Sequence, residues 1–115
     1  MLPRLKRLNL KKDFKWVASG QKVETKYLKI FIKFGDNQMS RVGIAVSGKN
    51  FKKASERNKV RRQVSGVFET LYLSLLPGIN IVALPKMSII GVKSQDVLLD
   101  LKEGLRNMLK QVDIK

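Results

Sequence analysis

An apolar stripe with helical spacing in the middle of the chain constrains the fold more than any other feature. Its members recur mostly at intervals of three and four residues: Val60, Val64, Val67, Phe68, Leu71 and Leu75. On a helix these side chains form one continuous face, which is stable only when another element covers it. Pro77 and Gly78 then end the periodic run. The sequence therefore predicts an amphipathic helix that packs against the rest of a small core.

The start of this helix is densely cationic. Residues 49–62 include seven cationic side chains and a single acid, Glu56. Arg57 and Arg61 flank the apolar stripe one turn apart, and guanidinium groups bind phosphate oxygens bidentately. The remaining circumference is covered by Asn58, Lys59 and Arg62. The cluster indicates RNA binding. The alternative is a solvated helix face, but such faces usually alternate in sign at i, i+4 spacing, and this one hardly does.

The overall charge favours the same interpretation. The chain of 115 residues has 24 Lys and Arg against 9 Asp and Glu, a formal net charge of +15 at pH 7, so we expect a polyanionic partner. Its length fits a single domain over residues 1–115. Histidine and cysteine are both absent, which removes imidazole catalysis, disulfides and the usual zinc sites. We therefore expect neither catalysis nor a cofactor site on the protein's own side chains.

The start of the chain lacks the features of a targeting segment. Residues 1–10 are basic and contain no apolar core of a secretory signal, and no apolar run is long enough to span a bilayer. We expect a flexible basic arm here and a cytoplasmic protein that does not bind membranes.

Residues 27–34 alternate as a half-buried strand does. Leu28, Ile30, Ile32 and Phe34 would face the core, and the opposite face would carry Tyr27, Lys29, Phe31 and Lys33. Residues 41–47 read as a second strand, joined through turn-forming residues 35–38, and a hairpin is the simplest arrangement. On the second face, rings could stack on unpaired bases while lysines follow the phosphates. The alternative for Phe31 is packing beneath a helix.

The remaining elements complete an α+β fold. A short helix is expected over Asp13–Ser19 and a buried strand over residues 79–84. Phe14 and Trp16 could extend the aromatic surface, although they cannot share one helix face, so one of them should be core. Ser94 can cap a last helix, whose apolar stripe would be Val97, Leu98, Leu101, Leu105, Met108, Leu109 and Val112. The predicted order is α-β-β-α-β-α, a two-layer sandwich in which part of one sheet face stays open.

The basic cluster resembles the hallmark of the bacterial ribonuclease P protein subunit, which reads Arg-Asn-Arg, an aliphatic residue, then Lys-Arg. The matching residues are Arg57-Asn58-Lys59-Val60-Arg61-Arg62. Two other segments match in order and spacing: Lys11-Lys12-Asp13-Phe14, and the strand Arg41-Val42-Gly43-Ile44-Ala45-Val46-Ser47. The resemblance extends from about residue 5 to residue 72, and beyond it the pattern agrees more than the residues do.

This resemblance implies a fold with a left-handed βαβ crossover, against the right-handed norm. It also implies a monomer that binds the catalytic RNA of ribonuclease P and the 5′ leader of precursor tRNA, while the RNA and its Mg²⁺ ions perform the cleavage. Contacts to the catalytic RNA would come from Arg57, Asn58, Lys59, Arg61, Arg62, Lys53, Lys52 and Lys49. Contacts to precursor tRNA would come from Phe14, Trp16, Tyr27, Lys29, Phe31, Lys33, Lys12, Arg41 and Ser47.

Several positions depart from the family pattern. Lys59 keeps the charge of the third motif residue but loses the guanidinium fork, and Glu56 adds an acid directly before the motif. The segment 47–53 is one residue longer than usual, and residues 84–86 read Leu-Pro-Lys where Arg-Lys-Pro is common. The usual second aromatic residue of the first helix is missing, and Trp16 could replace it.

Two other classes of protein fit the composition. A ribosomal or other structural RNA-binding protein would carry a similar charge but would not need an aromatic and lysine surface besides the helix motif. A membrane-surface protein would leave the apolar side of a basic helix available to lipid. Here strands are expected to cover that side, so the membrane interpretation is the weakest of the three.

Overall fold

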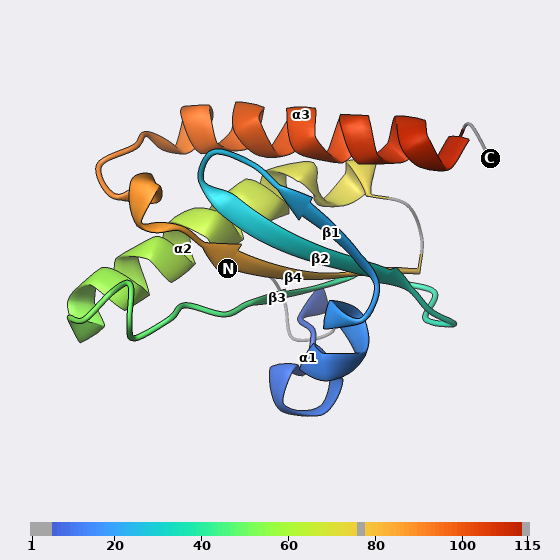
Figure 1. Cartoon of the computed structure of the whole chain (residues 1–115), viewed down its shortest axis with the longest axis horizontal. Coiled ribbons are helices and arrows are strands. Elements are labelled where there is room, and N and C mark those ends of the chain that lie inside the picture. The colour runs from blue at the N-terminus through green and yellow to red at the C-terminus, as the bar shows by residue number, and fades with distance from the viewer. Residues whose placement is uncertain (1–5, 76–77, 114–115) are drawn as a thin grey trace.

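The computed structural model describes residues 6–75 and 78–113. Within these ranges, the side chains of Ser74 and of residues 108–113 are not described. The elements follow in the order α1 (Leu10–Ala18), β1 (Gln21–Glu24), β2 (Leu28–Phe34), β3 (Arg41–Ile44), α2 (Ala54–Leu71), β4 (Ile79–Pro85) and α3 (Ser94–Asp113). One four-stranded sheet carries α2 and α3 on one face and α1 on the other (Figure 1). The α+β class is confirmed. The predicted order lacked β1, and the predicted sandwich left open the face that α1 partly covers.

The sheet is mixed, with strand order β1-β2-β4-β3. β2 pairs antiparallel with β1 on one side and with β4 on the other, while β3 runs parallel to β4. The predicted hairpin of residues 27–34 and 41–47 is therefore wrong, because β4 lies between those two strands. A parallel pair needs a crossover connection, and α2 supplies it as a β3-α2-β4 unit. The left hand of that crossover stays a prediction of the family resemblance.

The main core lies between the sheet and the pair of helices α2 and α3. From α2 it includes five of the six predicted residues, each at most 6% exposed: Val60, Val64, Val67, Phe68 and Leu71. Leu75 follows a 3₁₀ turn and is only partly buried. From α3 come Val97, Leu101 and Leu105, as expected, whereas the side chains of Met108, Leu109 and Val112 lie outside the described residues. Phe34 was expected in the core but is 44% exposed, because β2 ends there and the chain turns at Gly35.

A second, smaller cluster lies between α1 and the opposite face of the sheet, which we call the outer face. Leu8, Val17 and Val82 are buried there, and Leu10, Phe14, Phe31 and Leu84 pack around them. The helix begins at Leu10 rather than at Asp13, because the Asn9 side chain accepts a hydrogen bond from the Lys12 N–H at 3.3 Å and caps the first turn. Gly43 of β3 permits close packing, since a Cβ there would lie 2.6 Å from a methyl group of Leu10.

Part of the predicted flexible arm packs on the sheet. Residues 1–5 lie outside the described residues, but Leu8 is buried and its N–H donates to the Val42 carbonyl at 3.0 Å. The Lys6 ammonium lies 4.3 Å from the centre of the Tyr72 ring. The Tyr72 hydroxyl donates to the Ser40 carbonyl at 2.7 Å, and burial raises the pKa of this phenol. The arm therefore follows the β3 edge from Lys6 onward.

The turn between β1 and β2 is fastened to α3. Both oxygens of the Asp100 carboxylate accept main-chain hydrogen bonds, from Lys26 at 3.2 Å and from Tyr27 at 3.1 Å. Gly104, one turn later, permits contact with the same turn, since a Cβ there would lie 2.5 Å from the Thr25 methyl group. Among the described helices, none is long and apolar enough to cross a bilayer.

Candidate RNA-binding surfaces

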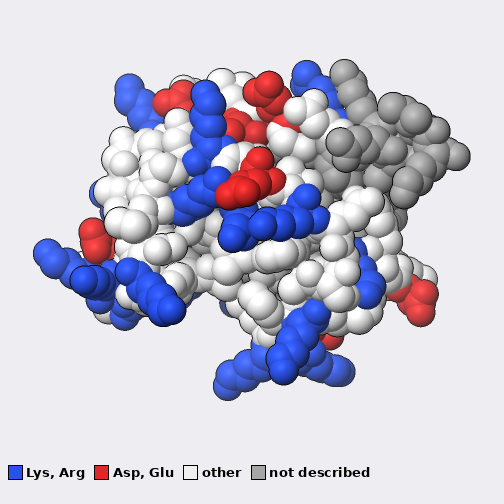
Figure 2. Space-filling model, in the orientation of Figure 1, with Lys and Arg blue, Asp and Glu red and all other residues white. Residues whose placement is uncertain are grey.

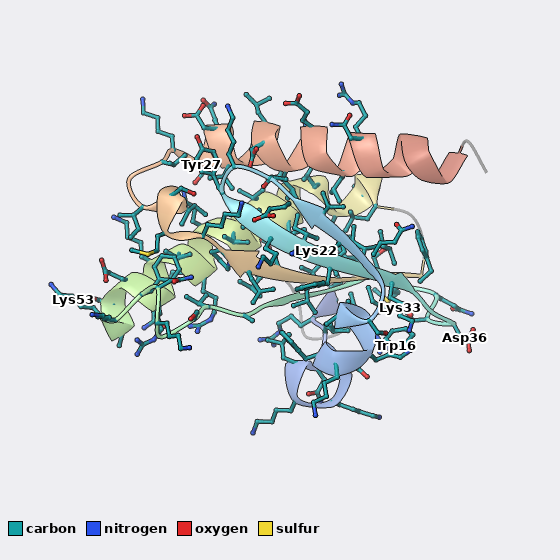
Figure 3. The ribbon with its side chains drawn as sticks, viewed as in Figure 1. Trp16, Lys22, Tyr27, Lys33, Asp36 and Lys53 are labelled. Atoms are coloured by element: carbon teal, nitrogen blue, oxygen red, sulfur yellow. The ribbon has the colours of Figure 1, made fainter. Side chains whose placement is uncertain are left out.

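The cationic cluster lies at the amino-terminal end of α2 and in the loop before it. The helix begins at Ala54, so Arg57 lies in its first turn rather than at its start. Glu56 is also in this turn, where a carboxylate interacts favourably with the helix dipole. Lys53 lies at the tip of this end of the molecule (Figure 3). The exposed members are Lys49, Lys52, Lys53, Asn58, Lys59 and Arg62.

Arg57 and Arg61 differ from these because both side chains are half-buried and already hydrogen-bonded. Nη1 of Arg57 donates to the carbonyl oxygens of Phe51 at 2.8 Å and of Lys52 at 3.0 Å. Phe51 is fully buried, so Arg57 fastens the loop to the helix. Nη1 of Arg61 donates to Oδ1 of Asn58 at 2.9 Å, which orients both side chains on the helix surface. Arg57 is thus partly structural, whereas Arg62 has no such role.

The outer face carries three of the four residues predicted for the strand surface. Phe31 pairs with Val82 of β4 and is half-buried in the small cluster with Phe14. Lys29 and Lys33, two residues before and after Phe31, project from the same face of the sheet and are also half-buried. Phe14 and Phe31 therefore lie on one surface as predicted. The Phe31 ring packs under α1, as the structural alternative expects, and is only partly buried, while its stacking on a base stays a prediction.

Tyr27 does not lie on the outer face, contrary to the prediction. It was expected beside Lys29, but β2 begins at Leu28, and the Tyr27 ring packs against the main core. Its N–H is held by Asp100. Figure 3 shows Tyr27 near α3, far from Trp16 and Lys33 at the other end of β2. The alternation of the sequence could not reveal that the strand begins one residue later.

Trp16 lies at the end of the outer face near Lys33 and Gly35 (Figure 3). Its side chain is 42% exposed, whereas Phe14 packs in the small cluster. Of these two aromatic residues, Phe14 therefore belongs to the core. The Lys33 ammonium lies 5.1 Å from the Trp16 ring centre and donates to Ser19 Oγ at 2.9 Å. Trp16 therefore presents an aromatic face beside a cation.

The other predicted precursor-tRNA contacts lie around this face. Lys12 is exposed on α1. Arg41 pairs with Asn80 from one side of β4 while Lys33 pairs with it from the other, so both cations belong to one row of the outer face. Ser47 lies in the loop after β3, where its Oγ accepts a hydrogen bond from the Lys49 N–H at 3.1 Å.

Two further cations on or beside the outer face escaped sequence reasoning. Lys22 of β1 pairs with Phe31 and is exposed. The alternation of residues 21–24 was the available signal, but four residues are too few to separate a strand from a loop. Lys86 follows β4 and forms a 2.9 Å ion pair with Glu24. This lysine, through its hydrogen bond and its charge, holds the pKa of the Glu24 carboxyl below its usual value.

On the view of Figure 2, Lys and Arg side chains gather at the start of α2 and on α1, with a mostly uncharged surface between them, and further Lys and Arg side chains lie among Asp and Glu in the middle and upper part of the view. Within the described part of the chain, no group of three or more acidic side chains could hold a metal ion. The side chains present on both surfaces are suited to phosphates and bases rather than to cation binding.

Comparison with known proteins agrees with this geometry. The ribonuclease P family model matches residues 2–109. The ribonuclease P protein components of Pseudanabaena and of Clostridioides difficile are each 34% identical to this chain; the matches cover 99% and 96% of it, and 97% and 95% of those proteins. The solved ribonuclease P protein of Thermotoga maritima superimposes with a TM-score of 0.75 at 29% identity, covering 91% of this chain and 96% of that one. The Staphylococcus aureus protein, at 20% identity and a TM-score of 0.76, supports the fold alone.

Fold and surface together define a small RNA-binding α+β protein. The chain belongs to the ribonuclease P protein family and is thereby a component of the ribonuclease P holoenzyme, the endoribonuclease of tRNA 5′ maturation. Its partners are accordingly the ribonuclease P RNA and precursor tRNA. The family membership decides against the ribosomal and membrane-surface alternatives.

Proposed function

We propose that the protein binds the catalytic RNA with the start of α2 and the unpaired 5′ leader of precursor tRNA with the outer face. The observation that carries this division is the placement of the two surfaces on different elements. The α2 cluster is cationic and without aromatic rings on its exposed part, which suits a phosphate backbone. The outer face combines half-exposed rings with lysines, which suits a single strand with accessible bases.

Contacts to the catalytic RNA come from the exposed residues of the α2 cluster, together with the guanidinium N–H groups of Arg57 and Arg61 that the hydrogen bonds described above do not use. These residues are Lys49, Lys52, Lys53, Arg57, Asn58, Lys59, Arg61 and Arg62. Contacts to the leader come from Lys12, Phe14, Trp16, Lys29, Phe31, Lys33, Arg41 and Ser47. Lys22 joins the second set because it is exposed next to Phe31 on the same face.

The chemical step in this proposal belongs to Mg²⁺ ions held by the RNA. The protein raises the local affinity for substrate by fixing the leader and by reducing repulsion between phosphates. One copy of the protein serves one catalytic RNA, and the complex works in the cytoplasm.

Reconstitution with a bacterial ribonuclease P RNA tests the proposal. At low Mg²⁺, added protein should raise the rate of leader removal, and RNA-free protein alone should cleave nothing. The protein should also tighten binding of leader-bearing precursor tRNA more than that of mature tRNA. Cleavage by the protein alone, or equal tightening of both tRNAs, would contradict the division of roles.

A further inference from the structure

A cavity of about 480 Å³ lies between the first half of α2 and the chain that follows β4. One wall is a face of α2, with Glu56, Lys59, Val60 and Gln63 at positions i, i+3, i+4 and i+7. The other wall is the segment Ile89–Val92, and the start of α3 closes the end with Lys93 and Ser94. The volume is in the range of small-molecule sites.

The inner part of this cavity is apolar, and polar groups lie around its opening. Val60 and Ile89 are buried, at 6% and 1% exposure, whereas Ile90 is 52% exposed. Lys59 on the α2 wall and Lys93 at the end of the cavity are exposed cations. Glu56 is half-buried and is the acidic residue of the lining. Such a site offers two aliphatic surfaces for a flat group and two cations for an attached anion.

A hydrogen bond joins the two walls of the cavity and holds them in place. Nε2 of Gln63 on α2 donates to the Val92 carbonyl at 2.7 Å. Gly91, with φ of +80°, supplies the turn that brings Val92 back toward α2 and leaves open space where a Cβ would be. The opening therefore does not depend on a side chain moving away.

The cavity is continuous with the α2 cluster, and this position indicates which ligand could enter the cavity. Lys59 belongs both to the cavity and to the cationic surface assigned above to the catalytic RNA, and Arg62 follows it by less than one turn. An RNA strand bound to that surface as proposed above would pass the opening. A base that leaves its stack gains contact with aliphatic or aromatic walls, as in other sites that read unpaired nucleotides.

We propose that this cavity binds one unpaired nucleotide of the catalytic RNA. The base lies between Val60 and Ile90, and its phosphate is held by Lys59 and Lys93. The Glu56 carboxylate accepts a hydrogen bond from an amino group on the base edge. The inference rests on the proposed function, because it extends the α2 surface from backbone contact to contact with a single base.

Site-directed probing in the holoenzyme tests the position. The chain has no cysteine, so Ser94→Cys carries a single tethered iron–EDTA group at the cavity opening. Its radicals should cut the catalytic RNA within one short unpaired segment. Lys53→Cys at the tip of α2 is the positive control. Arg106→Cys is the distant control, because it lies twelve positions further along α3 than Ser94, a distance of about 18 Å.

Affinity measurements test the base contact with matched variants. Ile90→Ser should weaken binding of the catalytic RNA about ten-fold, because the base loses the apolar contact of one side of its site. Leu99→Ser makes a comparable change at an exposed leucine of α3, 62% exposed, and should change the affinity less than about two-fold. Lys93→Ala should weaken binding, whereas Lys102→Ala should not. All four positions are exposed, so the substitutions should leave the melting temperature nearly constant. The melting temperature of each variant is measured as a control.

The outcomes separate the two levels of inference. Cutting from Lys53→Cys without cutting from Ser94→Cys overturns the nucleotide site and leaves the α2 surface standing. Cutting from Ser94→Cys in precursor tRNA or in a double helix, or equal effects of Ile90→Ser and Leu99→Ser, also overturns it. No cutting from either probe in an assembled holoenzyme overturns the α2 assignment and the nucleotide site together.

Discussion

The Lys33 ammonium lies 5.1 Å from the centre of the Trp16 ring and is held there by a 2.9 Å hydrogen bond to Ser19 Oγ. Cation and ring come from β2 and α1, so the pair fixes the end of the helix over the end of the strand. One side of the ring is thereby next to a cation, and the side chain keeps 42% of its surface exposed. A base can stack on the exposed part while its phosphate approaches Lys33.

Trp16 is the only tryptophan of the chain, so its fluorescence reports on this position alone. Leader-bearing precursor tRNA should quench the emission of the holoenzyme, and leaderless tRNA should quench it much less. Trp16→Ala should weaken binding of the leader-bearing substrate by about 1–3 kcal/mol, with little change in melting temperature because the ring is exposed. Equal quenching by both tRNAs would remove Trp16 from the leader surface.

Phe31 requires a subtler substitution, because its ring also packs with Phe14 and Val82. Phe31→Leu keeps most of the packing and removes the aromatic face. We expect weaker binding of leader-bearing precursor tRNA, by about 1 kcal/mol or more, and unchanged assembly with the catalytic RNA. Calorimetric melting and the two binding constants are measured together. A leucine variant that melts normally but binds both tRNAs like the wild type would assign Phe31 to the core alone.

The sequence predicted the elements better than their arrangement. The periodicity of residues 60–71 and the alternation of residues 28–34 identified a helix and a strand, because each pattern is set by burial of one face. The predicted hairpin was wrong because alternation records which face of a strand is buried and not which strand lies beside it. β4 was recognised as a buried strand, but nothing local to residues 79–84 says that it separates β2 from β3.

The candidate sites were predictable to a similar extent. Charge density located the α2 cluster, and alternation located Lys29, Phe31 and Lys33 on one face. The structural role of Arg57 depends on the carbonyl groups of a loop whose path cannot be read from residue types. The loss of Tyr27 from the outer face likewise depends on Asp100, 73 positions away along the chain.

Arg57 and Arg62 should separate structural from electrostatic contributions in the α2 cluster. Arg62→Ala removes an exposed cation, so it should reduce the magnitude of the salt slope of RNA binding by about 0.7–0.9 and leave melting unchanged. Arg57→Ala should reduce the slope similarly and also lower the melting temperature, because two carbonyl groups lose a charged donor. Lys102→Ala on α3 is the matched control. A normal melting temperature for Arg57→Ala would show that its loop contacts contribute nothing to stability.

Asp100 should matter for stability and not for RNA binding. Asp100→Asn keeps the size of the side chain but replaces one acceptor oxygen with a donor that faces a main-chain N–H of Lys26 or Tyr27. We expect a loss of about 1–3 kcal/mol in the free energy of unfolding, measured by denaturant titration, while Glu103→Gln, an exposed change on the same helix, should be nearly neutral. Because Tyr27 is turned toward α3, affinity for leader-bearing precursor tRNA should stay at the wild-type value below the melting transition. A selective loss of leader affinity in Asp100→Asn would instead return Tyr27 to the leader surface.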